Sequence, residues 1–223
     1  IICMAKMLES RFNKLDTFKS LIVPVLYVGF PILLVFMQPD LGTSLVYMAI
    51  FIGMLFISGI RLRLIRIIAT VGVFLMPLAW FILKDYQKKR ILVFMNPDID
   101  PFGSGYHIIQ SKIAIGSGTI FGKGLFNGTQ SQLNFLPENH TDFIFSVIGE
   151  ELGFIGCVIV LILLFMLIYR SIKVAYTCND RFGMLLATGI SSMLCFEVLV
   201  NAGMTMGIMP VTGIPLPFIS YGV

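Results

Sequence analysis

Long apolar runs alternate with short polar connections over most of the chain. A helix needs about 20 mostly apolar residues to cross a membrane. Two shorter apolar runs, Ile1–Leu8 and Phe218–Val223, resemble the end of one further helix and the start of another. The pattern predicts membrane-spanning helices at Leu21–Met37, Leu41–Gly59, Leu64–Leu83, Phe143–Arg170 and Met184–Met209.

The composition agrees with this pattern. Hydrophobic residues make up 57% of the chain and charged residues only 13%, which excludes a soluble globular protein. Backbone polar groups must be paired within a bilayer, so long apolar runs fold as helices there. We predict an all-α polytopic membrane protein, with residues 1–223 in a single membrane domain. Because the first residue is Ile1 and the ends look like partial helices, we expect a piece of a longer protein.

Positive charges indicate which connections face the cytoplasm, because short cytoplasmic loops are enriched in Lys and Arg. Basic residues occur in Glu9–Ser20, after the second span and after the fourth, whereas Gln38–Asp40 and Met209–Pro217 have none. This alternation predicts that residues 84–142 lie outside the cytoplasm. The formal net charge of +4 therefore reflects membrane orientation. The basic residues form no stripe with stacking aromatics, so nucleic-acid binding is excluded.

Residues 84–142 are polar and rich in glycine, and we predict a large extracytoplasmic loop here, between the third and fourth spans. Loops longer than about 12–15 residues are usually functional or disordered. Apolar residues recur along this one, which predicts an ordered segment seated on the membrane. Its last residues include Glu138, His140 and Asp142, whose side chains can move protons or bind sugar hydroxyls. Asp142 could instead serve only as the N-cap of the next helix.

The same loop offers groups that could bind a phosphate. Gly116–Gly124 does not have the spacing of a P-loop. Backbone amides and the side chains of Arg90, Lys112 or Lys123 could still contact a phosphate without that motif. The alternative is a glycine-rich re-entrant scaffold that binds nothing.

Two further groups of polar residues lie near the predicted spans. Gln38 and Asp40 are either a plain turn with Asp40 as a helix N-cap or part of a functional outer rim. Glu150, Glu151 and Glu197 fall inside predicted spans, where carboxylates are costly and functional by default.

The last segment before the chain ends contains three prolines. Pro210, Pro215 and Pro217 cannot continue a helix, so we expect an irregular outer segment that faces the long loop.

Four blocks occur in order along nearly the whole chain: QPDLGT; the loop sequences SGYHIIQSKIAIGSG and GKGLFNGTQSQ; LPENHTDFIFSVIGEELGFIG; and GIMPVTGIPLPFISYG. On these blocks the chain resembles the SEDS family of RodA, FtsW and SpoVE, the shape, elongation, division and sporulation proteins, and within it most resembles RodA. The resemblance implies a SEDS-type bundle of about ten helices in the full protein. The upstream QPSE block and the residues that follow Tyr221-Gly222 in the family are missing, which fits a partial chain.

The resemblance also implies a function. SEDS proteins are peptidoglycan glycosyltransferases that polymerise lipid II outside the bacterial cytoplasmic membrane. The RodA-like pattern implies cell elongation and cell shape, with a class B penicillin-binding protein as transpeptidase partner and other cell-wall elongation proteins. The family's essential loop aspartate corresponds to Asp142.

We hypothesise that Asp142 is a general base on the acceptor hydroxyl, with His140 as the competing base. The diphosphate would be stabilised by cationic side chains, or by a divalent cation, Mg or Mn, held by Asp142 or Glu138. The candidates for substrate binding are Arg90, Lys112, Lys123, Glu138, His140, Gln38 and Asp40.

Two other functions are consistent with the sequence. Proline-broken segments and intramembrane carboxylates are also found in secondary transporters, so a lipid II flippase is the alternative. A non-catalytic scaffold for the cell-wall complex is a third reading, but it would not need the polar cluster at Asp142.

Overall fold

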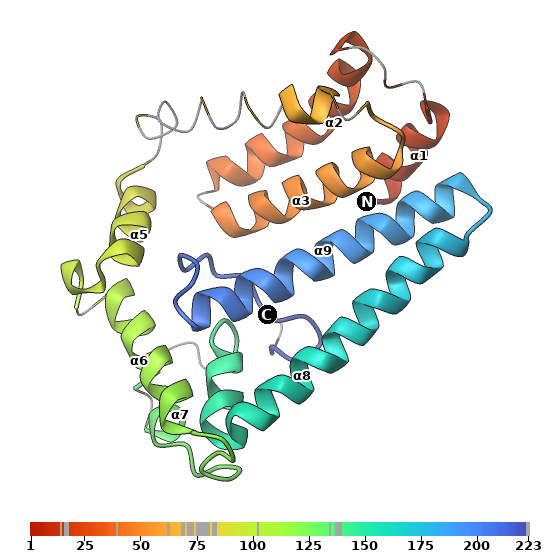
Figure 1. Ribbon diagram of the computed structural model, residues 1–223. Coiled ribbons are helices and arrows are strands. Elements are labelled where there is room, and N and C mark those ends of the chain that lie inside the picture. Colours follow the sequence, from red (N-terminus) through yellow and green to blue (C-terminus); the bar gives the residue numbers. More distant parts are fainter. Residues whose placement is uncertain are drawn as a thin grey trace. The chain divides into compact units, whose positions relative to one another are not determined.

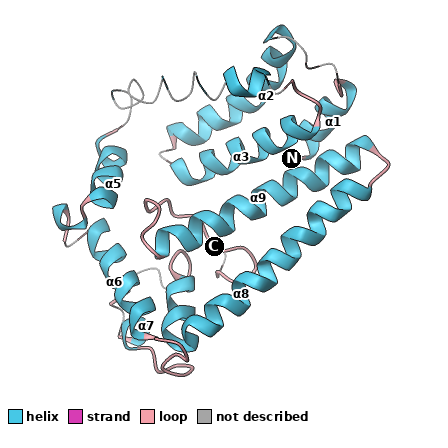
Figure 2. Ribbon diagram, in the orientation of Figure 1, coloured by secondary structure: helices cyan, strands magenta, loops and turns pink. Residues whose placement is uncertain are grey.

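The structure, a computed structural model, is helical in every regular element of the part of the chain that it describes (Figure 1, Figure 2). It describes residues 1–223 except 14, 16–17, 39, 62, 68–69, 71–73, 75–80, 82–83, 102, 134, 137–139 and 222–223. The helices are α1 (Ile2–Ser10), α2 (Phe18–Met37), α3 (Leu41–Ile57), α5 (Asp85–Met95), η1 (Pro97–Ile99), α6 (Ser104–Ser117), α7 (Thr129–Gln132), α8 (Ile144–Thr177) and α9 (Arg181–Thr205).

Among the described residues, three helices are long and apolar enough to cross a membrane: Lys19–Met37 within α2, and the whole of α8 and α9. Helix α3 is also apolar but shorter, at 17 residues. These four elements confirm that four of the predicted spans form apolar helices, and α2 continues through its two prolines. Most of the remaining span, Leu64–Leu83, lies outside the described residues.

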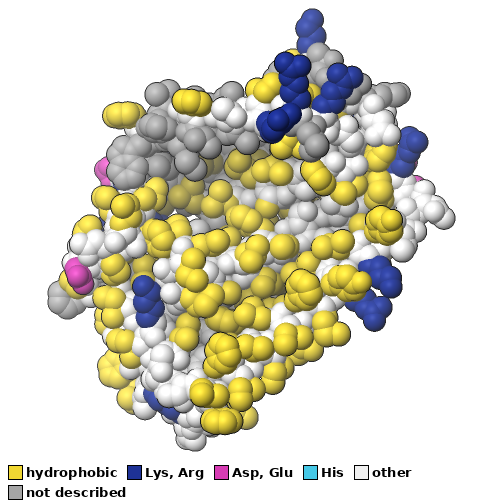
Figure 3. Space-filling model, in the orientation of Figure 1, with side chains coloured by type: hydrophobic (Ala, Val, Ile, Leu, Met, Phe, Trp, Pro, Cys, Tyr) yellow, Lys and Arg dark blue, Asp and Glu magenta, His cyan; other side chains and the backbone are white. Residues whose placement is uncertain are grey.

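The long helices expose large apolar side chains. On α8, Phe154, Leu163 and Phe165 are 65%, 61% and 67% exposed. Hydrophobic side chains cover much of the visible face in Figure 3. Such continuous apolar surface is unfavourable in water, whereas a bilayer would solvate it, so the fold is that of an all-α membrane protein.

The chain forms two compact units, and α8 and α9 contribute to both. The first unit contains Ile1–Ile82 and Leu167–Phe196, and the second contains Leu83–Met166 and Glu197–Val223.

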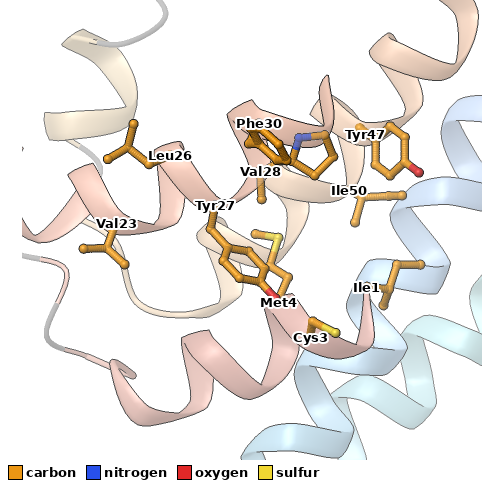
Figure 4. A pocket seen from close by; sticks show the side chains of 11 residues that line it. Ile1, Cys3, Met4, Val23, Leu26, Tyr27, Val28, Phe30, Tyr47 and Ile50 are labelled. Carbon is orange, nitrogen blue, oxygen red and sulfur yellow. The ribbon is translucent and has the colours of Figure 1, made fainter. Parts of the chain in front are cut away.

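In the first unit, α2 and α3 lie side by side and α1 packs against α2. A Cβ built on Gly53 of α3 would collide with Ser192 of α9, so the glycine permits a close approach of the two helices. Small residues commonly allow such contacts between membrane helices. The three N-terminal helices also line an apolar crevice of about 730 Å³, with side chains that include Met4, Tyr27 and Ile50 (Figure 4).

In the second unit, residues 84–142, which were predicted to form a long loop, contain α5, η1, α6 and α7. Pro97 lies at the start of η1, where its missing N–H is not needed. The ammonium of Lys89 on α5 is 3.0 Å from the carboxylate of Asp100, just after η1. The described part of the stretch is therefore built largely of short helices.

Helix α8 is interrupted near its start. Gly153 has φ 67° and ψ −164°, far from helical values. The turn formed by residues 119–124 pairs with the backbone groups that the interruption leaves without helical partners. The amides of Phe154 and Ile155 donate to the carbonyls of residues 119 and 120 over 2.9 and 3.2 Å. In return, the amides of residues 123 and 124 donate to the carbonyls of residues 150 and 151, both over 3.0 Å. This pairing meets the requirement that backbone groups at membrane depth be hydrogen bonded.

Candidate active site around Asp142

Asp142 lies in the turn of residues 140–143, directly before α8, and its side chain is half-buried. A Cβ built on Gly213 would lie 3.4 Å from its Oδ2 atom, so the carboxylate rests against the backbone of the C-terminal segment. The φ of Gly213 is +73°, which residues with a side chain rarely adopt. Glycine at this position thus allows the segment to pass beside the carboxylate.

The carbonyls of residues 140–142 each accept a hydrogen bond from a donor far along the chain. The amide of Tyr221 donates to the first carbonyl over 2.9 Å. The Oγ of Ser220 donates to the second over 2.7 Å, and the Nδ2 of Asn201 donates to the third over 2.9 Å. We call these three donors and three carbonyls the carbonyl clamp. It fixes the backbone of Asp142 to α9 and to the C-terminal segment.

The C-terminal segment is irregular, as the prolines predicted. Residues 210–216 have no regular secondary structure. The segment is held by side chains instead: Nδ2 of Asn201 also donates to the carbonyl of Ile214 over 2.7 Å, and Oγ of Ser220 accepts from the amide of Leu216 over 2.7 Å. The irregular segment and the turn before α8 therefore form one hydrogen-bonded structure.

Helix α6 joins the same region through Ser111, which is fully buried. Its Oγ donates to the carbonyl of Thr205 on α9 over 2.6 Å and lies 2.6 Å from the Oγ of Ser146 on α8. The next residue, Lys112, lays its side chain against Gly207, just after α9. A helix C-terminus carries partial negative charge that favours a cation. The structure thus brings Lys112 and the Asp142 carboxylate to one segment, residues 207–213.

Lys123 has a different environment. Its Nζ lies 2.8 Å from Oε1 of Glu150, which is completely buried, and 2.8 Å from the hydroxyl of Thr129. The carboxylate also accepts hydrogen bonds from the amides of Gln130 and Ser131, over 2.9 and 3.1 Å. The charge of Lys123 is therefore matched by a carboxylate, and Glu150 fastens residues 123–131 to α8.

Two other candidates in the second unit, Arg90 and His140, are described by the structure. Arg90 is half-buried on α5, and His140 is exposed, with its carbonyl in the clamp. Glu138 lies outside the described residues.

Gln38 and Asp40 belong to the first unit. Asp40 is the N-cap of α3: its Oδ1 accepts a hydrogen bond from the amide of Thr43 over 3.0 Å. The turn and N-cap reading of this block is therefore observed, and a role in substrate binding stays a prediction.

A divalent cation would find few protein ligands in the described chain. No group of three or more His, Cys, Asp and Glu side chains there could hold a metal ion. Mg²⁺ often uses only one or two carboxylates together with substrate phosphates, so Asp142 alone fits a cation that arrives with a diphosphate.

Comparison with known proteins gives the family. The model of the FtsW, RodA and SpoVE family, described as cell cycle proteins, matches residues 1–223. The chain belongs to this family.

Relatives of this FtsW/RodA/SpoVE chain are known from several bacteria. It is 47% identical to the peptidoglycan glycosyltransferase MrdB of Escherichia coli K12 over 97% of its length and 60% of that protein's. It is 41% identical to the stage V sporulation protein E of Bacillus subtilis, over 100% of its length and 60% of that protein's. The chain therefore spans about 60% of the length of these curated relatives.

Two solved structures are similar to this FtsW/RodA/SpoVE fold. One is a chain from a study of how a peptidoglycan synthase complex coordinates polymerization and crosslinking, with a TM-score of 0.78, 33% identity, and 98% of this chain and 60% of that chain covered. The other is the rod shape determining protein RodA of Thermus thermophilus, with a TM-score of 0.62, 30% identity, and 98% and 55% covered.

Several residues of this candidate site were not predicted from the sequence. Ser111, Asn201 and Ser220 hold its backbone, and the ring of His107 stacks on Phe143 with centroids 6.1 Å apart. Asn201 stands four residues after Glu197 in α9. A polar residue inside an apolar helix was the one available signal for it, because its partners are remote in sequence.

Proposed function

We propose that the protein is a peptidoglycan glycosyltransferase that polymerises lipid II at the outer face of the bacterial cytoplasmic membrane. The observation that carries the proposal is the half-buried Asp142 carboxylate, fixed at the start of a membrane-spanning helix by the carbonyl clamp. The names of the relatives, which include a peptidoglycan glycosyltransferase at 47% identity, support the same reaction.

Asp142 is proposed as the general base. The donor sugar leaves with a diphosphate, which is already a good leaving group, so the acceptor needs activation. The carboxylate takes the proton of the acceptor 4-hydroxyl as the oxygen attacks the anomeric carbon. The bond to the diphosphate breaks, and the diphosphate leaves with the electron pair. An α-linked donor then gives a β-1,4 bond with inversion. A positioned general base contributes roughly 10²–10⁴-fold in rate.

Cationic side chains are proposed to stabilise the departing diphosphate. Lys112 is the first candidate, because its exposed side chain lies against residues 207–213, the same segment that the Asp142 carboxylate contacts. Arg90 is the second. Lys123 is the third, because its ammonium is already bound by Glu150. A Mg or Mn ion held by Asp142 would add Lewis-acid stabilisation of the diphosphate, and proton transfer to the carboxylate does not require it.

The partners and the location belong to the same proposal. Lipid II is the substrate, and residues 84–142 lie outside the cytoplasm, as the charge pattern predicts. A class B penicillin-binding protein supplies transpeptidation during cell elongation. Similarity to a chain from a peptidoglycan synthase complex supports such a partner.

A lipid II flippase is the second candidate, and the interruption of α8 at Gly153 favours it. Transporters often build their binding sites from discontinuous membrane helices.

Polymerisation of purified lipid II by the full-length protein, with its penicillin-binding partner present, tests the proposal. Wild-type protein should make glycan strands and the Asp142→Asn variant should make none, while both insert into membranes equally. Polymer from both proteins would remove Asp142 from the reaction. Polymer from neither, together with lipid II translocation in vesicles, would favour the flippase.

A further inference from the structure

We propose that Asn201 and Ser220 are positioning residues that hold Asp142 in place for proton transfer. The inference rests on the proposed role of Asp142 as general base. Neither side chain has to contact the substrate. Both act on the backbone from which the carboxylate extends, through the carbonyl clamp.

Asn201 acts as a brace between two segments. It is fully buried, and its Nδ2 donates to the carbonyls of Asp142 and Ile214 over 2.9 and 2.7 Å. Both neighbours are acceptors, so only the amide nitrogen can face them. That orientation leaves Oδ1 with no hydrogen-bond partner among the described residues. Burial of an unpaired acceptor is unfavourable. Asn201 therefore satisfies two backbone carbonyls while its own oxygen stays unpaired.

Ser220 links a tight turn to the residue before Asp142. Its Oγ accepts from the amide of Leu216 and donates to the carbonyl of Thr141, each over 2.7 Å. The backbone amide of Ser220 closes the turn, because it donates to the carbonyl of Leu216 over 2.9 Å. A single hydroxyl thus transmits the position of the C-terminal segment to the turn before α8.

The clamp restricts the backbone on both sides of the Asp142 Cα atom, and the carboxylate itself lies against Gly213. Three successive carbonyls are bound, so the peptides at residues 140–142 cannot rotate without losing hydrogen bonds. The same segment that supplies Ser220 also passes beside the Asp142 carboxylate at Gly213. Misplacing a catalytic group by about 1 Å can cost on the order of 10²-fold in rate.

The kinetic test uses Ser220→Ala, Ser220→Thr and Asn201→Asp in the full-length protein with its partner. Ser220→Ala should lower kcat roughly 10- to 100-fold with little change in KM, and Ser220→Thr should restore kcat because it keeps the hydroxyl. Asn201→Asp removes both donors and should lower kcat further. The matched control is Ser171→Ala, which removes an exposed hydroxyl that binds only the carbonyl of Leu167 on its own helix. Wild-type kcat in Ser220→Ala would overturn the inference, as would a fall in thermal stability with kcat unchanged.

A second measurement does not depend on the reaction. In a background from which the native cysteines have been removed, among them the four of this chain, Asp142→Cys is labelled by a small charged thiol reagent, with and without Ser220→Ala. Loss of the clamp should speed labelling several-fold, whereas Ser171→Ala should not; equal rates would overturn the inference. If Asp142→Asn still polymerises lipid II, the proposed base is wrong, and the labelling rates alone then decide whether the clamp holds this position.

Discussion

Replacement of Glu150 and Lys123, singly and together, tests how residues 123–131 are held on α8. The carboxylate of Glu150 is 0% exposed, and it accepts hydrogen bonds from Lys123, Thr129, Gln130 and Ser131. The side chain of Lys123 is 27% exposed, so it can turn toward solvent if its partner is lost. The two single variants should therefore differ.

The expected magnitudes follow from what each variant leaves buried. Lys123→Met leaves a buried carboxylate without its counter-ion, which costs about 3–5 kcal/mol, and the three neutral donors that remain place it near the lower value. Glu150→Gln replaces one acceptor oxygen by an NH2 group. The amide of Gln130 or of Ser131 then faces a donor and loses its hydrogen bond, which costs about 1–3 kcal/mol. The double variant buries no charge, so its loss of stability should be smaller than the sum of the two single losses, with a coupling free energy of about 1–3 kcal/mol.

Hydrogen exchange of the amides of Gln130 and Ser131 measures these costs locally. A loss of about 3 kcal/mol corresponds to exchange roughly 150-fold faster. Glu151→Gln is the control, because it removes the same charge from a neighbouring side chain that bonds to no described residue. The view that this ion pair fastens residues 123–131 to α8 would be refuted by unchanged exchange in both single variants. It would also be refuted if the free-energy costs of the two single variants were strictly additive in the double variant.

Three other changes test single contacts in the fold. Gly153→Ala should weaken the pairing of α8 with the preceding turn, because the φ of 67° and ψ of −164° at this position cost other residues about 1–3 kcal/mol and the new Cβ would collide with the amide of Gly122; limited proteolysis of the turn would show it. Ser111→Ala should lower the free energy of unfolding by about 1–3 kcal/mol, since the hydroxyl bridges two helices, whereas Ser117→Ala on the same helix should cost less; thermal unfolding in detergent compares them. Asp40→Ala should cost about 0.5–2 kcal/mol as a lost N-cap. Asp40→Asn should restore both stability and lipid II polymerisation, unless the carboxylate binds substrate.

The sequence alone predicted the membrane helices, because their signal is local. A helix N-cap was one of the two alternatives for Asp40, and the proline-rich segment was predicted to be irregular. Both features depend on residues within a few positions of one another. Helix α6 was missed for a physical reason. Its buried face includes Ser111 and Ala114, both fully buried, and a small or polar face gives no hydrophobic periodicity.

The site itself was only partly predictable. Asp142 was proposed as its central residue because it stands in a polar cluster before an apolar run. Its supports were not, since Asn201 and Ser220 lie 59 and 79 residues from the carbonyls that they bind. The interruption at Gly153 was also missed, because an isolated glycine in an apolar run is compatible with a continuous helix. The deciding hydrogen bonds come from a turn that precedes α8 by many residues.

The carbonyl clamp also affects the order in which the protein matures during synthesis. The ribosome makes Asp142 well before Ser220, and 79 residues separate Thr141 from the hydroxyl that binds it. At a synthesis rate of about 5–20 residues per second, roughly 4–16 s pass between the synthesis of Thr141 and that of Ser220. During this interval α8 can enter the membrane while the turn before it is still free to move. The backbone of the proposed base is therefore fixed late, only after α9 and the following segment have folded back onto the turn.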